Sequence, residues 1–284
     1  MTLRTSEEIV EDREKGASEL LEDVLESIQN MKEDEIIVYL KKLVRKRYSM
    51  TPLINLSNQI FLSIEEGKEV EQQILEMREK SVSKRTEAAN KMKRLLDRKE
   101  HDKISTLSRS STVLQSLSGV EKVVVLESRP RQEGRGTAER LNEKGIDVDY
   151  WVDAGMCKAM EGVDSVVIGA DTISRKGFLN KIGSRALAVI AEMMGKEVFV
   201  VSDSLKILPA RIPVPQGESH PPEEVWDTSK DINVKNDYFE LTDLKRGKFV
   251  TEDGVKSSKK IKKIAEKKKV SERLLEIHPL IRER

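Results

Sequence analysis

The chain is poor in the residues that form disulfides and metal centres. It has one cysteine and three histidines among 284 residues. A single thiol cannot form an internal disulfide, so we expect Cys157 to be a small packing residue. The scattered histidines and this cysteine do not give the spacing of a metal site. The composition therefore predicts a protein without a bound metal or other cofactor.

Long apolar segments are also missing. No apolar run approaches the roughly 20 residues that are needed to cross a bilayer. The first 16 residues, MTLRTSEEIVEDREKG, lack the apolar centre of a signal peptide. We therefore expect a cytoplasmic protein that makes no contact with a membrane.

Aromatic residues are scarce and charged residues abundant, at 4% and 36% of the chain, which is typical of long charged helices. Residues 256–284 contain eleven Lys and Arg against four Glu, a net charge of +7. Because the whole chain carries +1, the preceding residues carry −6. This tail could contact RNA or an acidic protein surface. It has no interleaved aromatic residues for base stacking, which favours a solvated, partly frayed helix over an RNA-binding segment.

Helical patterns fill the first hundred residues, and strand patterns follow. We expect helices over residues 33–47, from Pro52 to Gly67, and over 68–98, after a capping box formed by Thr5 and Glu8. Strands are predicted at about 103–107, 122–127, 147–152, 164–169 and 197–202. Their alternation with helical segments indicates a parallel sheet, and the absence of a GxGxxG motif argues against nicotinamide binding.

The predicted fold class is therefore α/β. It comprises a helical N-terminal domain (residues 1–100), a Rossmann-like parallel-sheet domain (101–255) and a basic C-terminal tail (256–284) that we expect to be helical.

Residues 164–184, DSVVIGADTISRKGFLNKIGS, form the most informative segment. Its apolar run reads as a central strand, after which Gly169 leaves room for Asp171 at the carboxyl edge, where open sheets bind ligands. Ser184 is placed to cap the next helix, and a helix N-terminus near Lys181 would suit a phosphate. Taken singly, Asp171 is better read as capping a turn and Lys181 as a surface lysine.

This segment resembles the superfamily that contains the alpha, beta and delta regulatory subunits of translation initiation factor 2B. The superfamily also contains two sugar-phosphate isomerases, which act on methylthioribose 1-phosphate and ribose 1,5-bisphosphate. The resemblance extends over about residues 36–255. It includes ESRPRQEGR at 127–135, which is similar to the family's arginine-rich loop, and the short helix expected at 153–164.

The resemblance implies particular site residues. Asp171 stands at the family's acid position. The implied ligand-binding residues are Arg129, Arg131, Arg135, Asn180, Lys181 and Lys206. Considered without the resemblance, the arginine loop could equally form a salt-bridge network with Glu127 and Glu133.

Two departures separate the chain from the isomerases. Ser108, in Thr-Leu-Ser, stands where they have a cysteine in a Thr-His-Cys type sequence. An unassisted hydroxyl cannot replace a thiolate as a base near neutral pH. Residues 49–52, SMTP, stand where they have an Arg-Gly-Ala phosphate loop. Both departures bring the resemblance closer to the regulatory subunits.

The resemblance therefore implies a non-catalytic, archaeal-type homologue of the regulatory subunits, an oligomeric scaffold that senses a sugar phosphate or nucleotide in translation initiation. We expect a homodimer or higher oligomer, with subunits of initiation factor 2 as further partners. Residues 238–250 read as an extended piece that would pack against a partner. The alternative function is ribose-1,5-bisphosphate isomerase of archaeal nucleoside recycling, which interconverts an aldose and a ketose phosphate. A nucleic-acid-binding role of the basic tail is a third possibility.

Overall fold

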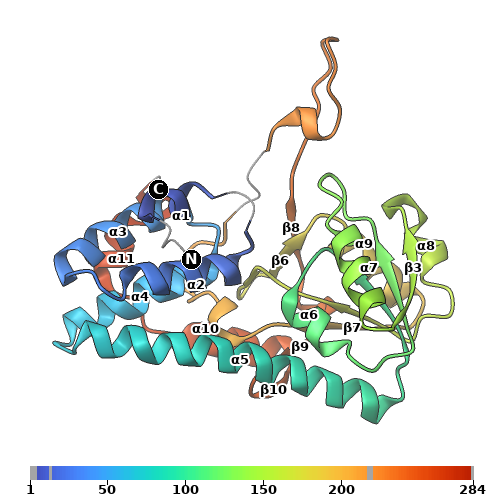
Figure 1. Cartoon of the computed structure of the whole chain (residues 1–284), viewed down its shortest axis with the longest axis horizontal. Helices are drawn as coiled ribbons and strands as arrows, with labels where there is room; N and C mark the ends of the chain where they lie inside the picture. The colour runs from blue at the N-terminus through green and yellow to red at the C-terminus, as the bar shows by residue number, and fades with distance from the viewer. Residues whose placement is uncertain (1–4, 13–14, 216–219, 283–284) are drawn as a thin grey trace.

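The computed structural model describes residues 5–12, 15–215 and 220–282 (Figure 1). The N-terminal region is helical, as expected. Its helices are α1 (Ser6–Glu11), α2 (Ala17–Ile28), α3 (Glu33–Lys46), α4 (Thr51–Glu65) and α5 (Val70–Lys99). The predicted capping box is present: the Thr5 hydroxyl accepts from Glu8 N, and Thr5 N donates to the Glu8 carboxylate at 2.7 Å. Apolar faces of these helices, including Ile28, Leu40 and Phe61, form one buried cluster.

Helix α5 connects the two ends of the molecule. Ile74 and Met77, near its start, pack in the cluster of the N-terminal helices. Met92 and Leu96, near its end, pack against the sheet instead. Figure 1 shows α5 running beneath both regions. Because one continuous helix contributes to both cores, it fixes how the helices approach the sheet.

The C-terminal region is built on a seven-stranded sheet, and all five predicted strands are confirmed. The strands are β1 (Lys103–Leu107), β2 (Lys122–Leu126), β3 (Asp147–Trp151), β4 (Ser165–Ile168), β7 (Glu197–Val201), β9 (Lys248–Thr251) and β10 (Gly254–Lys256). Their order is β10-β9-β7-β4-β1-β2-β3, and every pair is parallel except β10 with β9. This mostly parallel sheet and the helical N-terminal region confirm the predicted α/β class.

Helices cover both faces of this sheet. They are α6 (Ser111–Ser116), α7 (Gly134–Glu143), α8 (Met156–Ala159), α9 (Ser184–Met193) and α10 (Ser258–Lys267). Alternate residues along β4 enter different cores: Val167 packs with α5 and α6, whereas Val166 and Ile168 pack with α8, α9 and α10. Burial on both faces explains why the strands read as continuous apolar runs.

A second, smaller sheet was not predicted. It has the order β5 (Thr172–Ile173), β6 (Phe178–Lys181) and β8 (Phe239–Thr242), with antiparallel pairing. Residues 238–250 include two extended segments, as expected, and their packing against a partner stays a prediction. β8 pairs with β6 and β9 with β7, so their ladder hydrogen bonds are made within the chain.

Three local expectations also need correction. Cys157 is exposed rather than packed. Gly183, not Ser184, is the N-cap of α9. Its φ of 98° lies in the left-handed region, which glycine adopts easily. The basic tail is helical but not frayed: α10, α11 (Glu272–Ile277) and α12 (Pro279–Arg282) follow one another, and Leu274 and Ile277 are buried against the N-terminal helices.

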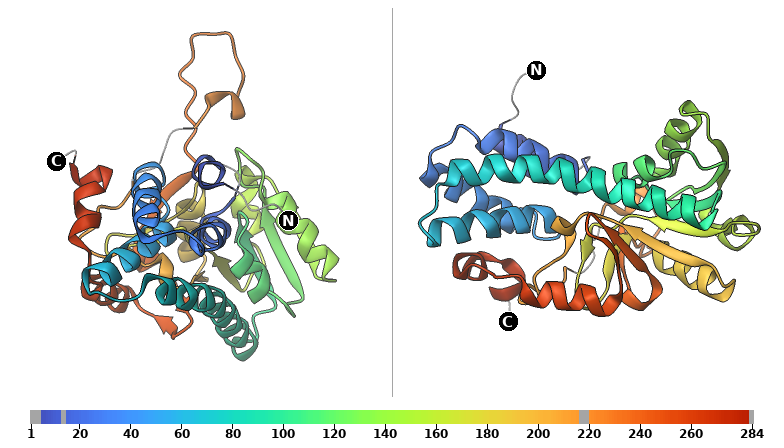
Figure 2. Two further views of the ribbon diagram at one scale, coloured as in Figure 1. Left: turned by 60° about the vertical axis from the view of Figure 1, so that its left-hand side comes forward. Right: turned by 90° about the horizontal axis from the view of Figure 1, so that it is seen from below.

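Short 3-10 helices complete the fold: η1 (Asp153–Gly155), η2 (Ser204–Lys206), η3 (Pro222–Glu224) and η4 (Leu244–Arg246). Residues 220–237, which we call the arm, project away from the body between β7 and β8 (Figures 1 and 2). The arm carries the exposed side chain of Trp226. Within the described ranges, no helix combines the length and the apolar character that a membrane crossing requires.

Candidate functional site

The candidate site lies where the strand order of the large sheet reverses. From β1 the chain proceeds outward to β2 and β3, and it then returns to β4 and continues on the other side of β1. Ligands of open parallel sheets bind at the carboxyl edge of such a switch point. A cavity of about 360 Å³ is present there, and residues of α1, α2 and α3 help to line it. The N-terminal helices therefore complete the wall of a cavity that begins at the edge of the sheet.

Ser108 follows β1 at this edge and lines the cavity. Its φ is 68°, and Ser128, which follows β2, has a φ of 66°. Left-handed backbone is uncommon outside glycine, and here hydrogen bonds hold it in place. Ser108 N donates to Ser128 Oγ at 2.7 Å, and the Ser108 carbonyl accepts from Thr137 Oγ1 at 2.9 Å. The Ser108 hydroxyl itself has no hydrogen-bond partner among the described residues.

The arginine-rich loop is pinned beneath the end of β2. Backbone N–H groups of Ser128 and Arg129 donate to the Asp153 carboxylate at 2.8 and 2.7 Å. A Cβ at Gly134 would lie 2.0 Å from the Leu126 carbonyl oxygen, so only glycine permits this close approach.

The three arginines of this loop point to different places. Arg131 lines the cavity, whereas Arg129 and Arg135 do not. Arg129 Nη2 donates to the Val225 carbonyl in the arm at 3.2 Å. Arg135 Nη2 lies 4.0 Å from Glu127 Oε1 and is largely exposed. The alternative prediction of a salt bridge with Glu127 therefore describes Arg135, while Arg131 is the one arginine of the three that lines the cavity.

Lys181 is the most deeply buried cation of the site, with 3% of its side chain exposed. It extends from β6, and its Nζ lies 2.6 Å from Glu133 Oε1. The same Nζ lies 4.7 Å from the ring centroid of Tyr238 and 5.5 Å from that of Phe239. The other Glu133 oxygen, Oε2, is buried without a hydrogen-bond partner in the described ranges. Lys181 is thus a charged group inside the fold and not the surface lysine of the simpler interpretation.

An aromatic wall beside Lys181 was missed from the sequence. The rings of His220 and Tyr238 stack at 3.5 Å with 9° between their planes, and both line the cavity. The only sequence signal for this wall was the adjacent pair Tyr238 and Phe239 in a chain with 4% aromatic residues. The partner of this pair, His220, is 18 residues away at the other side of the arm, so no local pattern links them.

Asp171 follows β4 and lines the same cavity as Lys206 and Lys181. Burial raises the pKa of the Asp171 carboxyl; the charges of Lys206 and Lys181 act in the opposite direction, and that of Glu133 adds to the rise. Within the described chain, no hydrogen bond reaches this carboxylate. It therefore remains available to a ligand.

Asn180 and the start of α9 have structural roles at the cavity wall. Asn180 Nδ2 donates to Ser184 Oγ at 2.8 Å, and Ser184 Oγ donates to the Lys181 carbonyl at 2.6 Å. Backbone N–H groups of Gly183 and Arg185 donate to Glu240 Oε1 at 2.7 and 2.9 Å. The expectation that this helix N-terminus meets a phosphate is wrong, because a carboxylate of the chain already occupies it.

Residues 49–52, the second departure from the isomerase pattern, also reach the site. Ser49 and Met50 line the cavity. Thr51 and Thr172 share a hydrogen bond of 2.7 Å between their hydroxyl groups. Residues 49–52 thus contribute polar and apolar contacts; the nearby Arg47 also lines the cavity, and its Nε donates to the Val10 carbonyl at 2.6 Å.

A buried polar network fixes the 3-10 helix that ends at Lys206. Ser204 N donates to Glu252 at 3.0 Å, and Lys84 Nζ lies 2.9 Å from the same carboxylate. Lys268 Nζ donates to the carbonyls of Ser204 and Ile207 at 3.1 and 2.7 Å. Burial lowers the pKa of Lys268 to about 8. Side chains from α5, β9 and α10 therefore position Lys206.

The charges of the site favour an anion with hydroxyl groups. Arg131, Lys181 and Lys206 supply positive charge, while Asp171 can accept hydrogen bonds. Among the described residues, no group of three or more His, Cys, Asp or Glu is arranged to hold a metal ion.

Fold and site together define a Rossmann-like α/β protein with a cation-lined cavity at the switch point of its sheet. The chain belongs to the initiation factor 2 subunit family, whose sequence model matches residues 7–268. The resemblance inferred from the motifs is thereby confirmed.

Individual relatives include both kinds of protein in this superfamily. Over 130 residues the chain is 36% identical to ribose 1,5-bisphosphate isomerase of Methanocaldococcus jannaschii, a match that covers 44% of this chain and 42% of that protein. The match spans less than half the length of that curated relative.

Two solved structures share the fold. Translation initiation factor eIF-2B of Pyrococcus horikoshii OT3 superposes with a TM-score of 0.73 and 24% identity, over 88% of this chain and 94% of that one. 5-Methylthioribose 1-phosphate isomerase of the same organism superposes with a TM-score of 0.69 and 21% identity, over 88% of this chain and 82% of that one.

Proposed function

We propose that the chain binds a phosphorylated small molecule, a sugar phosphate or a nucleoside monophosphate, in the switch-point cavity. In this proposal it acts without catalysis, as a homologue of the regulatory subunits of initiation factor 2B and an oligomeric scaffold in translation initiation in the cytoplasm. The observation that carries the proposal is the buried Lys181 ammonium, which faces the cavity beside Lys206 and Arg131. Such a set of cations inside a fold suits a phosphate.

The ligand is held by different groups at its two ends. The phosphate lies among Lys181, Lys206 and Arg131, whereas Arg135 does not line the cavity. The sugar hydroxyls donate to the Asp171 carboxylate. The ring edges of Tyr238 and Phe239, which line the cavity, offer apolar contacts to the sugar ring or a base.

Calorimetry with the full chain and a ligand panel tests binding. The panel comprises ribose 1,5-bisphosphate, methylthioribose 1-phosphate and a nucleoside monophosphate. Lys206→Ala removes one charged contact and should weaken binding by about 1.5–3 kcal/mol. Lys245→Ala, an exposed lysine outside the cavity, is the matched control and should bind as the parent does. No binding at millimolar ligand, or equal affinity in both variants, would refute the proposal.

The proposal that the chain is not an isomerase depends on Ser108. Isomerisation of an aldose 1-phosphate needs a placed acid and base, and this hydroxyl has no hydrogen-bonded base in the described chain. We expect no turnover of ribose 1,5-bisphosphate or methylthioribose 1-phosphate above background in a product assay.

Ribose-1,5-bisphosphate isomerase is the second candidate, and Asp171 is the observation that favours it. A carboxyl whose pKa is raised by burial can hold a proton closer to neutral pH and exchange it with substrate. Efficient turnover that is lost in Asp171→Asn would replace the scaffold proposal with this enzyme.

We also propose association into a homodimer or higher oligomer, with subunits of initiation factor 2 as further partners. Support comes from exposed apolar side chains on the sheet region: Met193, Val152 and Leu241 are 82%, 56% and 39% exposed. Sedimentation equilibrium should give at least a dimer at micromolar concentration. A monomer at all concentrations would contradict the proposal.

A further inference from the structure

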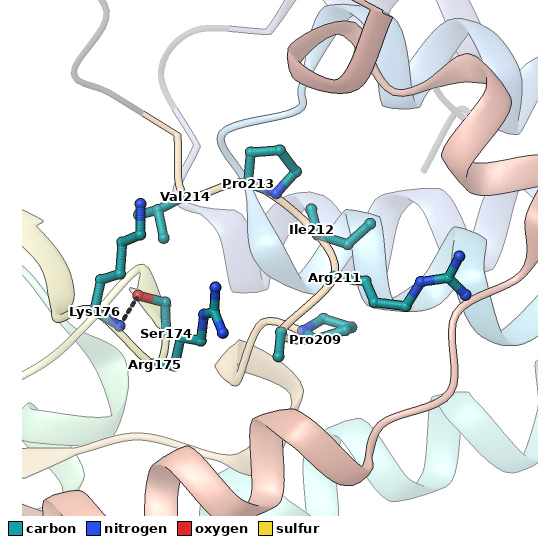
Figure 3. A pocket seen from close by; sticks show the side chains of 9 residues that line it. Ser174, Arg175, Lys176, Pro209, Arg211, Ile212, Pro213 and Val214 are labelled. Carbon is teal, nitrogen blue, oxygen red and sulfur yellow. Dashed lines mark hydrogen bonds between the residues drawn. The ribbon is translucent and has the colours of Figure 1, made fainter. Parts of the chain in front are cut away.

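A second cavity, of about 300 Å³, lies outside the switch-point site (Figure 3). It is lined by residues 174–176, at the turn between β5 and β6, and by residues 209–214, and it shares no lining residue with the first cavity. Ile173 and Ile207 form a parallel bridge, and Leu208 N donates to the Ile173 carbonyl at 2.8 Å. These paired segments therefore carry Asp171 and Lys206 at one end and the second cavity at the other.

The turn on one side of this cavity presents two adjacent cations. Ser174 Oγ donates to the Gly177 carbonyl at 2.9 Å and accepts from Lys176 N at 3.2 Å, which fixes the backbone of the turn. Arg175 and Lys176 stand exposed at its tip. Neither side chain forms an ion pair or hydrogen bond with the described residues. The described residues therefore hold two positive charges together without supplying a counter-ion.

Arg211 differs from these two cations. Its Nη1 lies 3.1 Å from Glu272 Oε1. In Figure 3 its guanidinium group points away from Arg175 and Lys176. Among the described lining residues, the cations without an ion pair are thus those of the turn.

The opposite wall is apolar and rigid. It consists of Pro209, Ala210, Ile212, Pro213 and Val214. Ile212 and Val214 also pack against the core of the N-terminal helices. Two prolines restrict the backbone of this wall. A ligand that enters meets the two cations of the turn on one side and the partly exposed side chains of Pro213 and Val214 on the other (Figure 3).

We propose that this second cavity binds a small amphiphilic anion, a phosphate or carboxylate group attached to an apolar group. The anion pairs with Arg175 and Lys176, whose mutual repulsion it relieves. The apolar group packs on Ala210, Pro213 and Val214, the partly exposed apolar residues of this wall. The volume lies at the lower end of the range for small-molecule sites, which limits the ligand to a compact one.

Phenyl phosphate, inorganic phosphate and benzoate are the probes for this proposal. They are titrated calorimetrically into full-length Lys206→Ala protein, in which the switch-point site is weakened. Phenyl phosphate should bind more tightly than inorganic phosphate, because its ring leaves water for the apolar wall. Equal affinity of these two probes would mean an adventitious ion only and would overturn the amphiphilic class of ligand. Benzoate is compared with phenyl phosphate. Tighter binding of benzoate would indicate a carboxylate ligand, and tighter binding of phenyl phosphate a phosphate ligand.

In the same background, Arg175→Ala/Lys176→Ala removes the two cations of the turn. Affinity for phenyl phosphate should fall by about tenfold or more. The matched control is Lys91→Ala/Arg94→Ala on α5, which removes one exposed lysine and one exposed arginine outside both cavities. Unchanged affinity in the first double variant, or an equal loss in both, would overturn the proposal.

Discussion

The two cavities lie at opposite ends of the same paired segments, yet they hold their cations in contrasting ways. In the switch-point cavity Lys181 is buried, and Glu133 lies 2.6 Å from its ammonium group. In the second cavity Arg175 and Lys176 are exposed, and the described chain offers them no carboxylate. Burying an ion costs several kcal/mol unless a partner offsets the loss of water, whereas an exposed ion keeps its hydration.

This contrast separates buried charges that stabilise the fold through an ion pair from exposed charges that do not contribute to stability. Removal of a buried charge leaves its partner unpaired, so a change in the first cavity should affect both stability and binding. Removal of an exposed charge should affect binding alone. Measurements of unfolding free energy and of ligand affinity on the same variants therefore test this distinction.

Lys181→Met should give the largest effect. The Glu133 carboxylate, whose Oε2 already lacks a hydrogen bond, then loses its ion partner as well. We expect the free energy of unfolding in urea to fall by about 3 kcal/mol. Lys181→Met/Glu133→Leu removes both charges and should recover most of this loss. A single variant that loses less than about 1 kcal/mol would show that water already compensates Glu133.

His278 should make the helical support of the second cavity sensitive to acid. Its side chain is fully buried next to Ile277 of α11, and neither ring nitrogen has a hydrogen-bond partner in the described chain. Burial lowers its pKa to about 4. The unfolded chain, with a pKa near 6.5, takes up the proton first as the pH falls. Stability is therefore lost between about pH 6.5 and 4.

The expected loss at pH 4.5 is about 2 kcal/mol. His278→Leu should remove this part of the pH dependence, and urea unfolding of both proteins at pH 7 and 4.5 measures it. Amide hydrogen exchange should show α11 opening before β4 in acid. Parallel pH profiles for the two proteins would contradict this assignment.

The sequence predicted the large sheet well because its signals are local. Each of the five expected strands is a short apolar run between polar segments, and burial on both faces requires such runs. The small sheet was missed, although residues 238–250 were read as extended. It pairs residues 178–181 with residues 239–242, and neither segment is apolar throughout. Since α9, β7 and the arm lie between these two segments, no local pattern predicts their pairing.

The site was predicted in part for a related reason. Residues that directly follow β1 and β4 must meet at one edge of the sheet, which brings Ser108 and Asp171 to one cavity. No such rule applies within the arginine loop. There the left-handed backbone at Ser128 and the hydrogen bonds to the Asp153 carboxylate determine where each arginine side chain points. Only Arg131 of the three arginines reaches the cavity.

Asp171→Asn should change stability less than Lys181→Met does, and it should stabilise the fold instead of destabilising it. Because the folded-state pKa of Asp171 is raised by burial, its neutral form is favoured in the fold, and that stability is lost as the pH rises through the raised pKa. The neutral amide should therefore raise the unfolding temperature at pH 7.5 and leave it nearly unchanged at pH 4. The gain is limited because Lys181 and Lys206 then lose a nearby negative charge. Thermal unfolding at the two pH values tests this, and a variant that is less stable at pH 7.5 would show that the carboxylate is needed to offset the lysines.

Arg175→Ala/Lys176→Ala should have the smallest effect on stability, and this makes it the sharpest test of the contrast. Both side chains are exposed and unpaired, and the turn beneath them is held by Ser174. We expect the free energy of unfolding to change by less than about 0.5 kcal/mol. Any change should be towards greater stability at low salt, since two adjacent positive charges repel each other there. Urea unfolding at low and high salt measures both quantities. A loss of more than about 1 kcal/mol would show that these cations have partners in the fold, and the distinction between structural and ligand-directed charges would then fail at the second cavity.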